Sequence, residues 1–132
     1  MSVYVTDTHP LIWYASSKHA KLSIKALKAF DKAFCEQALI YIPAFVFWEI
    51  SLLIRVGRIS PGESYESWVE RLCAHPGFKL AVVDAEVLIK AHEYAFQDPF
   101  DAGIVATAAI LDIPLITRDQ DIAESRRVEI FW

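Results

Sequence analysis

Short apolar runs alternate with longer amphipathic segments along this chain. Five runs have the length and composition of buried strands, and they cover residues 3–7, 38–43, 79–83, 114–117 and 128–131. Six segments are predicted to be helices: one beginning near Pro10, residues 21–34, the stretch from Pro43 to near Gly57, and residues 60–75, 84–95 and 98–112. Strands that alternate with helices predict an α/β fold with a parallel sheet covered on both faces. The last strand is expected at an edge of that sheet.

Several side chains are predicted to fill the core. Leu27, Phe30 and Phe34 stand at the spacing of one apolar helix face. Cys35 and Cys73 lie in predicted helical segments, and neither has a Cys or His neighbour at metal-ligand spacing. We therefore expect both cysteines to be reduced core thiols of a cytoplasmic protein.

The length and composition favour one domain. At 132 residues the chain is expected to form a single domain, residues 1–132, around one core. An apolar content of 55% and a mean hydropathy of +0.29 favour a well-filled core and an apolar face used for association. The longest apolar run, residues 38–48, contains Pro43 and is shorter than the roughly 18–20 residues of a membrane span. The first residues, MSVYVTDTHPL, have no basic leader, so no signal peptide is expected.

Three acidic residues fall at the ends of predicted strands or at the start of a helix. Asp7 follows the first strand, Asp119 follows the fourth, and Asp101 lies in the first turn of the helix over residues 98–112. In open parallel sheets, sites form outside the carboxyl ends of the strands. Each acid also has a structural alternative, because Asp7 and Asp119 suit helix caps or turns and Asp101 suits the helix dipole. Asp98, followed by a proline, is typical of an N-cap, whereas Asp101 shares its helix face with apolar residues and is expected to point inward.

A fourth acid, Glu49, lies inside an apolar helical run. Nearly every residue from 38 to 54 is apolar, and Leu52 and Leu53, one turn after Glu49, offer no opposite charge. A lone buried carboxylate is costly unless a partner satisfies it. Either the helix turns Glu49 toward solvent, or another segment of the chain brings it a cation.

Together the four acids predict a site for a hard divalent cation. Carboxylates within a few ångströms of one another repel, and some take up protons unless a cation enters. Oxygen ligands suit Mg²⁺ or Mn²⁺. The histidines are scattered along the chain, which argues against zinc: His9, His19, His75 and His92. Only His9 is expected near the site, as a loop residue or a substrate contact.

Four segments, taken in order, resemble the PIN domain family: Asp7 in VTDTHPLIW, Glu49 in VFWEISLL, Asp101 in DPFDAGIVATA and Asp119 in LITRD. The resemblance covers residues 3–128 and is to the VapC-like toxins of bacterial and archaeal toxin–antitoxin pairs in particular. It implies a three-layer α/β/α sandwich with a mainly parallel sheet. It also implies a Mg²⁺- or Mn²⁺-dependent endoribonuclease that uses the four acids. Many relatives carry Arg directly after the third acid, so Ala102 puts in doubt a phosphate or salt-bridge role at that position.

The resemblance and the chemistry of metal-dependent hydrolysis suggest a role for each acid. Asp7 and Asp101 are expected to bind the ion directly, while Glu49 and Asp119 act through water, hold a second ion or orient the attacking water. Thr117 is a candidate hydrogen-bond partner at the rim. The resemblance also implies a homodimer and a cognate antitoxin protein, which could block the site by presenting an Arg to the carboxylates.

Contacts to RNA phosphates require cations. The net charge of −4 and the pI near 5.5 argue against a general nucleic-acid binder, although acids gathered at a metal can hide a basic rim. Arg118, beside Asp119, is a candidate phosphate contact or an ordinary surface salt bridge. Trp13, Phe47 and Trp48 are assigned to the core or an interface. Four lysines recur at alternating four- and three-residue spacing, as a solvated helix face or an RNA track: Lys21, Lys25, Lys28 and Lys32.

Three other interpretations of the acids are possible, and the sequence argues against two of them. A phosphoacceptor receiver domain requires two acids after the first strand and a lysine after a late strand, whereas Asp7 stands alone and Arg118 replaces the lysine. A haloacid-type phosphatase requires an aspartate two residues after Asp7, where His9 stands. A non-catalytic PIN-like scaffold that binds protein or RNA stays open, although the presence of all four acids argues against lost catalysis.

Overall fold

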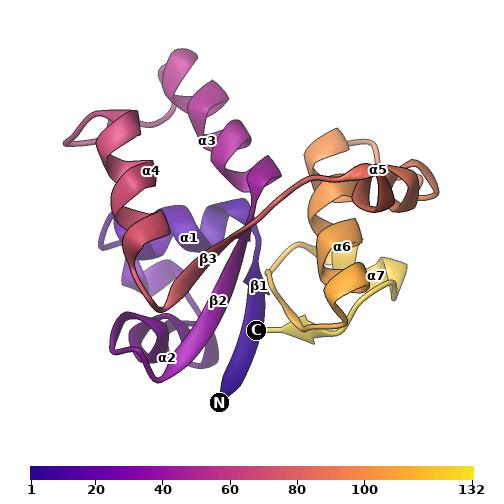
Figure 1. The fold of residues 1–132 in the computed structure, drawn as a ribbon, viewed down its shortest axis with the longest axis horizontal. Coiled ribbons are helices and arrows are strands. Elements are labelled where there is room, and N and C mark those ends of the chain that lie inside the picture. The colour runs from indigo at the N-terminus through magenta and orange to yellow at the C-terminus, as the bar shows by residue number, and fades with distance from the viewer.

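Five strands and seven α-helices alternate in the computed structural model, which describes all 132 residues (Figure 1). The strands are β1 (Ser2–Thr6), β2 (Ala38–Pro43), β3 (Phe78–Ala81), β4 (Leu115–Ile116) and β5 (Ile130–Phe131). The helices are α1 (Thr8–Ala15), α2 (Ile24–Phe34), α3 (Ala44–Arg55), α4 (Tyr65–Ala74), α5 (Ala85–His92), α6 (Pro99–Leu111) and α7 (Gln120–Ser125), with a 3₁₀ turn η1 (His19–Lys21). All five predicted strands are present, whereas α7 and η1 were not predicted.

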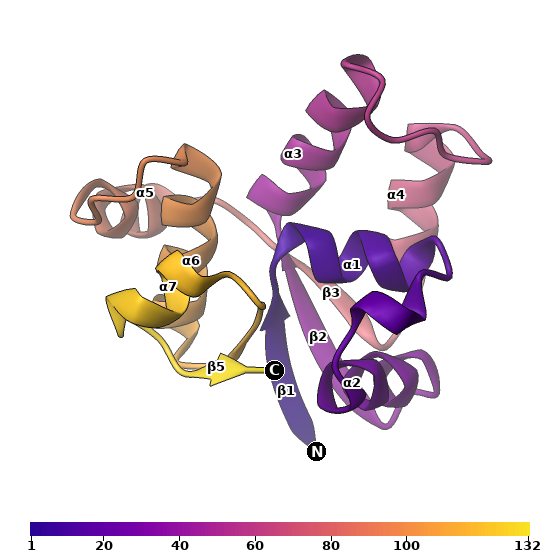
Figure 2. The ribbon, with the colours of Figure 1, turned by 180° about the vertical axis from the view of Figure 1, so that it is seen from behind.

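The sheet is entirely parallel, with the strand order β3-β2-β1-β4-β5. Helices α1 to α4 lie on one side of it and α5 to α7 on the other, as both views show (Figures 1 and 2). This confirms the three-layer α/β/α arrangement and the edge position of the last strand. None of the helices combines the length and the apolarity that crossing a membrane requires.

The strand order reverses beside β1. The chain passes from β1 to β2 and β3 in one direction, and then returns to the other side of β1 to form β4 and β5. Ligand sites of open α/β sheets form outside the carboxyl ends of the strands at such a reversal. Asp7 directly follows β1 and Thr117 directly follows β4, so both lie at this point of the sheet.

The core is built from the inner faces of the strands and the buried faces of the helices. Phe30, Ile40, Ile104 and Leu115 are completely buried, and they come from α2, β2, α6 and β4. Trp13 and Phe47 are also buried, as predicted, whereas Trp48 is exposed.

Three predicted core residues are instead exposed. Phe34 is the last residue of α2, so its ring lies beyond the buried face of the helix, is 60% exposed and stacks on His75. Cys35 caps the end of α2 and is exposed, and Cys73 is exposed on α4. The prediction of buried thiols was therefore wrong, because both cysteines lie on outward-facing positions of their segments.

Helices α3 and α6, which carry Glu49 and Asp101, approach each other closely. A Cβ atom at Gly103 would lie 2.6 Å from the ring of Phe45, so the absence of a side chain permits this approach. At its other end, α3 ends at Arg55, close to the predicted Gly57, whose φ of +77° is the left-handed conformation that glycine adopts readily. The fold thus brings two acids that lie far apart in the sequence onto neighbouring helices.

Candidate functional site

Asp7 is held at the end of β1 by two hydrogen bonds. Its Oδ1 accepts from the backbone N–H of Thr8 at 2.8 Å, which makes it the N-cap of α1. Its Oδ2 accepts from the hydroxyl of the buried Thr117 at 2.7 Å, across the point where the strand order reverses. Burial raises the pKa of Asp7, and the two hydrogen bonds and the nearby His9 oppose that rise. The cap interpretation is therefore correct, but it accounts for only one of the two oxygens.

Glu49 is half-buried on α3 and has a neutral partner that the sequence analysis missed. The hydroxyl of Thr8 donates to its Oε1 at 2.5 Å, across 41 positions of sequence. Burial raises the pKa of Glu49, the Thr8 hydroxyl lowers it, and the carboxylates of Asp98 and Asp7 raise it further. Glu49 is therefore not turned fully toward solvent, and the other predicted outcome, a cation shared with the other acids, stays a prediction.

Asp101 lies at the start of α6 without a hydrogen-bond donor of its own. Asp98 is the N-cap of that helix, as predicted, and accepts from the backbone N–H of Phe100 at 2.8 Å, with Pro99 as the first helical residue. Burial raises the pKa of Asp101 to about 7, and the neighbouring carboxylates add to this rise in the order Asp98, Asp7, Asp119 and Glu49. The three other predicted acids thus all act electrostatically on Asp101.

Asp119 and Thr117 connect the end of β4 to the site. Asp119 is the N-cap of α7, and its Oδ1 accepts from the backbone N–H of Ile122 at 3.0 Å. The Thr117 oxygen accepts from the backbone N–H of Asp119 at 3.0 Å while its hydroxyl donates to Asp7. Thr117 therefore fixes the two acids relative to each other, a tighter role than the rim contact that was predicted.

The donor chemistry of this cluster fits a hard divalent cation. Its side-chain donors are carboxylate and hydroxyl oxygens, which are the ligands that Mg²⁺ and Mn²⁺ prefer. No group of three His, Cys, Asp or Glu side chains is close enough to hold one ion jointly in this structure. Mg²⁺ is commonly bound by one or two carboxylates and retains several waters, so a pair of these acids is sufficient.

Glu49 lines a cavity of about 750 Å³ together with Asp98. Two further cavities open beside the other acids. One of about 260 Å³ is lined by seven residues, namely Asp7, His9, Pro10, Trp13, Thr117, Arg118 and Asp119. The other, of about 800 Å³, contains Asp98 and Asp101 on one wall and Asp121 and Arg127 on another. Arg118 and Thr117 therefore lie where they were predicted, beside Asp7 and Asp119.

The predicted lysine stripe is divided between two elements. Lys25, Lys28 and Lys32 are exposed on α2, whereas Lys21 belongs to the separate turn η1. Figures 1 and 2 place α2 beside the amino-terminal halves of β1 and β2, away from the strand ends that carry the acids. Lys21 approaches the site instead, because its ammonium lies 5.8 Å from the ring centre of Trp13.

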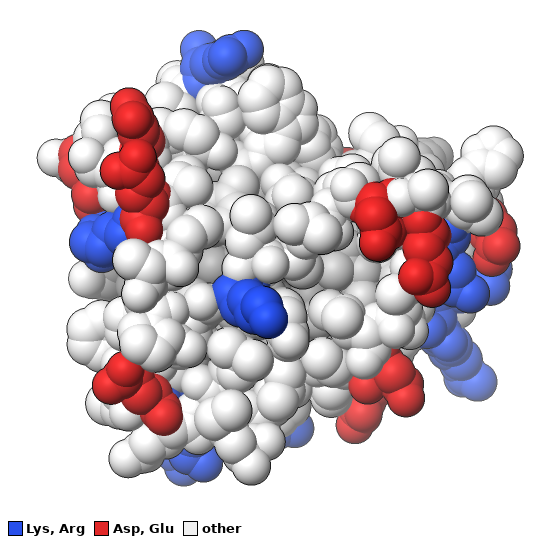
Figure 3. Space-filling view, in the orientation of Figure 1, with Lys and Arg blue, Asp and Glu red and all other residues white.

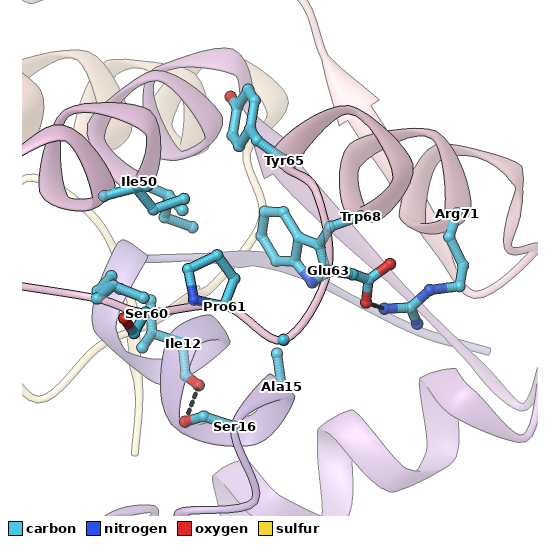
Figure 4. Close-up of a pocket in the computed structure, with 13 residues that line it drawn as sticks. Ile12, Ala15, Ser16, Ile50, Ser60, Pro61, Glu63, Tyr65, Trp68 and Arg71 are labelled. Atoms are coloured by element: carbon cyan, nitrogen blue, oxygen red, sulfur yellow. Dashed lines mark hydrogen bonds and ion pairs between the residues drawn. The ribbon is translucent and has the colours of Figure 1, made fainter.

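A separate apolar pocket of about 340 Å³ lies between α1, α3 and α4 (Figure 4). Ile12, Ile50 and Trp68 line it, and Arg71 is paired with Glu63 at its rim. None of the four predicted acids lines this pocket. Its lining suits apolar side chains of a bound partner rather than a phosphodiester.

Comparisons with known proteins agree with this architecture. The family model described as the PIN domain matches residues 4–128. The chain belongs to the PIN domain family. Nucleases of this family generally use divalent metal ions. No curated protein sequence is similar enough to match this PIN domain protein.

Solved structures with the same fold include VapBC2, FitAcB and FitAB. VapBC2 from Rickettsia felis, bound to a DNA fragment from its promoter, has a TM-score of 0.68 at 15% identity, covering 97% of this chain and 96% of that chain. FitAcB from Neisseria gonorrhoeae has a TM-score of 0.64 at 20% identity, covering 98% and 96%. FitAB bound to the IR36 DNA fragment has a TM-score of 0.63 at 18% identity, covering 97% and 93%. At these identities the likeness establishes the fold of this PIN domain protein.

Proposed function

We propose that this PIN domain protein is a Mg²⁺- or Mn²⁺-dependent endoribonuclease, and that it is the toxin of a toxin–antitoxin pair. The observation that supports the nuclease most directly is the electrostatic coupling of the acids. Asp7, Glu49 and Asp119 each raise the pKa of Asp101, which burial has already raised. A carboxylate whose pKa is raised by burial and by neighbouring carboxylates is stabilised in its ionised form by a cation, and a PIN domain is a scaffold on which nucleases are built.

In this proposal Asp7 and Asp101 bind the ion directly, and Glu49 and Asp119 act through water or hold a second ion. Bound there, a divalent cation supplies Lewis acidity toward a phosphodiester and a lowered pKa for water. Asp101 must lose its proton to bind the metal ion. Because its pKa is about 7, metal affinity should decrease at pH values lower than about 7.

The two threonines hold the acids ready for this chemistry. Thr117 orients Asp7 and Thr8 orients Glu49, each through a hydroxyl donor that leaves the carboxylate its full negative charge. Glu49 is positioned to orient the attacking water, since its second oxygen accepts no hydrogen bond from the protein. The hydroxyls thus restrict the carboxylates before a substrate arrives, which lowers the entropic cost of the reaction.

The second part of the proposal is a cognate antitoxin. The resemblance to VapC-like toxins implies such a partner, and the similar structures VapBC2 and FitAB are each bound to a DNA fragment. An antitoxin that presents an Arg to Asp7 and Asp101 would replace the cation with a charge-assisted, bidentate contact. The apolar pocket of Figure 4 is available for apolar side chains of the same partner.

We also propose that the chain forms a homodimer through an apolar surface. The face in Figure 3 looks onto the β3 edge, and its middle is almost free of charged side chains. Four apolar side chains on or after β3 and on α5 are exposed: Leu80 by 39%, Val82 by 66%, Leu88 by 54% and Ile89 by 65%. Exposed apolar side chains of this size are candidates for an association surface.

The nuclease is tested by RNA cleavage with Mg²⁺ or Mn²⁺, comparing wild type with Asp7→Asn and Asp101→Asn. Both variants keep an oxygen acceptor and lose the charge, so activity should fall about a hundredfold or more while the fold persists. Glu70→Gln, on the exposed face of α4, is the matched control and should cleave like wild type.

Binding of Mn²⁺ to the same proteins is measured by titration calorimetry. Equal cleavage by wild type and both Asn variants would indicate a contaminating nuclease and leave a non-catalytic PIN-like scaffold as the better description. Absence of metal binding by wild type would overturn the metal site itself.

A further inference from the structure

Arg118 is held against an aromatic ring rather than against a carboxylate. Its guanidinium carbon lies 4.4 Å from the ring centre of Trp13, within the range of a cation–π contact. Trp13 is only 8% exposed, and its other neighbours are Trp132 at 6.4 Å and His9 at 5.9 Å between ring centres. The ring is therefore fixed by packing, and Arg118 rests on a rigid support at the mouth of the cavity that contains Asp7 and Asp119.

The guanidinium N–H groups of Arg118 are free. The only ion pairs in the structure are Arg71–Glu63 and Lys90–Glu93, so Arg118 forms no salt bridge even though Asp119 is its neighbour in sequence. It also makes no hydrogen bond within the chain. A guanidinium that contacts a ring and forms no hydrogen bond or ion pair keeps its N–H groups available for a planar, two-pronged acceptor.

We propose that Trp13 is a positioning residue that holds Arg118 to bind a phosphate of the substrate strand beside the acids. This inference rests on the proposed nuclease function and adds to it a phosphate contact by Arg118 that Trp13 supports. A phosphate is the ligand that matches both neighbours, because it accepts a bidentate contact from Arg118 and lies next to the site of phosphodiester hydrolysis. Lys21, on the same ring, adds a second positive charge at this position. Trp13 itself is too buried to stack on a base.

The experiment measures binding of a labelled single-stranded RNA and of the same sequence as DNA, by fluorescence anisotropy in EDTA so that nothing is cleaved. For Arg118→Met we expect about tenfold weaker binding of both. Each lost phosphate contact also reduces the slope of log Kd against log salt by about 0.7 for a single strand. Arg118→Lys keeps that slope but loses the bidentate geometry and binds with intermediate affinity.

Arg55→Met is the matched control. Arg55 is also an exposed arginine on a tryptophan, 5.6 Å from the ring centre of Trp48, but it lines none of the cavities that contain the acids. The same loss of charge there should leave the affinity and the salt slope unchanged. An equal loss in both variants would mean that the effect is only a change in net charge, and would overturn the proposal.

The role of Trp13 is tested by a double-mutant cycle with Trp13→Leu and the conservative Trp13→Phe. If Trp13 acts through Arg118, Trp13→Leu weakens oligonucleotide binding in the wild-type background and has no further effect in Arg118→Met. Trp13→Phe keeps an aromatic surface and should restore most of the affinity. An additive loss in the double variant, with folding verified by thermal unfolding, would overturn the positioning role.

The outcomes also separate this inference from the nuclease. If wild type cleaves RNA and Arg118→Met binds both oligonucleotides as tightly as wild type with the same salt slope, only the inference fails, and a protein partner is left as the ligand of Arg118. A loss confined to RNA would place Arg118 on a ribose 2′-hydroxyl and would overturn the phosphate contact. If wild type does not cleave but the Arg118 effects are as expected, the phosphate contact stands and the nuclease fails.

Discussion

The substitution Asp101→Asn is expected to stabilise the metal-free protein above neutral pH. Asp101 has its pKa raised from 3.8 to about 7 in the folded state, first by burial and then by the surrounding carboxylates. Ionising this group therefore costs the folded state free energy that the unfolded chain does not lose. Asparagine is nearly the same size and carries no charge, so it removes this cost.

The size of the effect follows from the two pKa values. A rise from 3.8 to about 7 corresponds to about 4 kcal/mol at about 1.4 kcal/mol per pKa unit. The carboxyl is only half-buried, so solvent screening reduces this to about 2 kcal/mol. For a chain of this length, that is a rise in Tm of about 8 °C.

The sign depends on pH. Below about pH 4 Asp101 is protonated in both states and the cost is absent. As the pH rises from about 4 to about 7, the unfolded chain releases this proton first, so the free energy of unfolding of wild type falls relative to the variant. Above about pH 7 the full difference is present.

Thermal unfolding in EDTA at about pH 4 and about pH 8 tests this linkage. The Tm difference between Asp101→Asn and wild type should be near zero in acid and positive in mild base. Glu70→Gln, on the exposed face of α4, should show no comparable dependence on pH. Adding Mn²⁺ at about ten times its Kd should restore about 1.4 kcal/mol to wild type and little to the variant. A difference independent of pH, or a variant less stable at about pH 8, would refute the coupling of the acids.

Three further substitutions address other parts of the site and the proposed dimer surface. Glu49→Gln should leave the metal-free protein as stable or more stable while removing much of the stabilisation by Mn²⁺, measured by Tm with and without the metal. Thr117→Val should cost about 1.5–3 kcal/mol in urea unfolding, because the buried Asp7 loses its hydroxyl donor, and Thr117→Ser should restore most of it. Ile89→Glu should convert a dimer to a monomer in size-exclusion chromatography with light scattering. Ile24→Glu, at a residue of α2 that is 75% exposed, is the control and should leave the dimer intact. A dimer that persists in Ile89→Glu would exclude the apolar surface of β3 and α5 as the interface.

The strands, the helices and the helix caps could be predicted because their causes are local. A buried strand is a short apolar run, and the caps at Asp98 and Gly57 follow from residues within one turn of the helix end. The short α7 has too few residues to display a periodic pattern. Only Asp119 indicated where α7 begins, because a helix cap was one of the two roles predicted for that residue, the other being a site residue.

The contacts that complete the site could not be predicted from local patterns. Thr8 lies 41 residues before Glu49, and Arg118 meets Trp13 only because the ends of β1 and β4 are neighbours. A threonine hydroxyl or an exposed arginine has many possible partners, and the strand order selects among them. The exposure of Cys73 could not be predicted for the same reason, because the tertiary packing of a helix decides which of its sides faces solvent.

The nature of the partners explains why this fold retains so many acids at one point. Asp7, Glu49 and Asp119 are all held by neutral donors, namely two threonine hydroxyls and backbone N–H groups. Lysine or arginine partners would have satisfied the same oxygens and stabilised the metal-free protein, but they would have cancelled the charge. Neutral donors fix the geometry and leave the negative charge in place, at a cost seen in the raised pKa of Asp101. This arrangement supports the proposed metal site, because an added cation would stabilise the ionised form of Asp101.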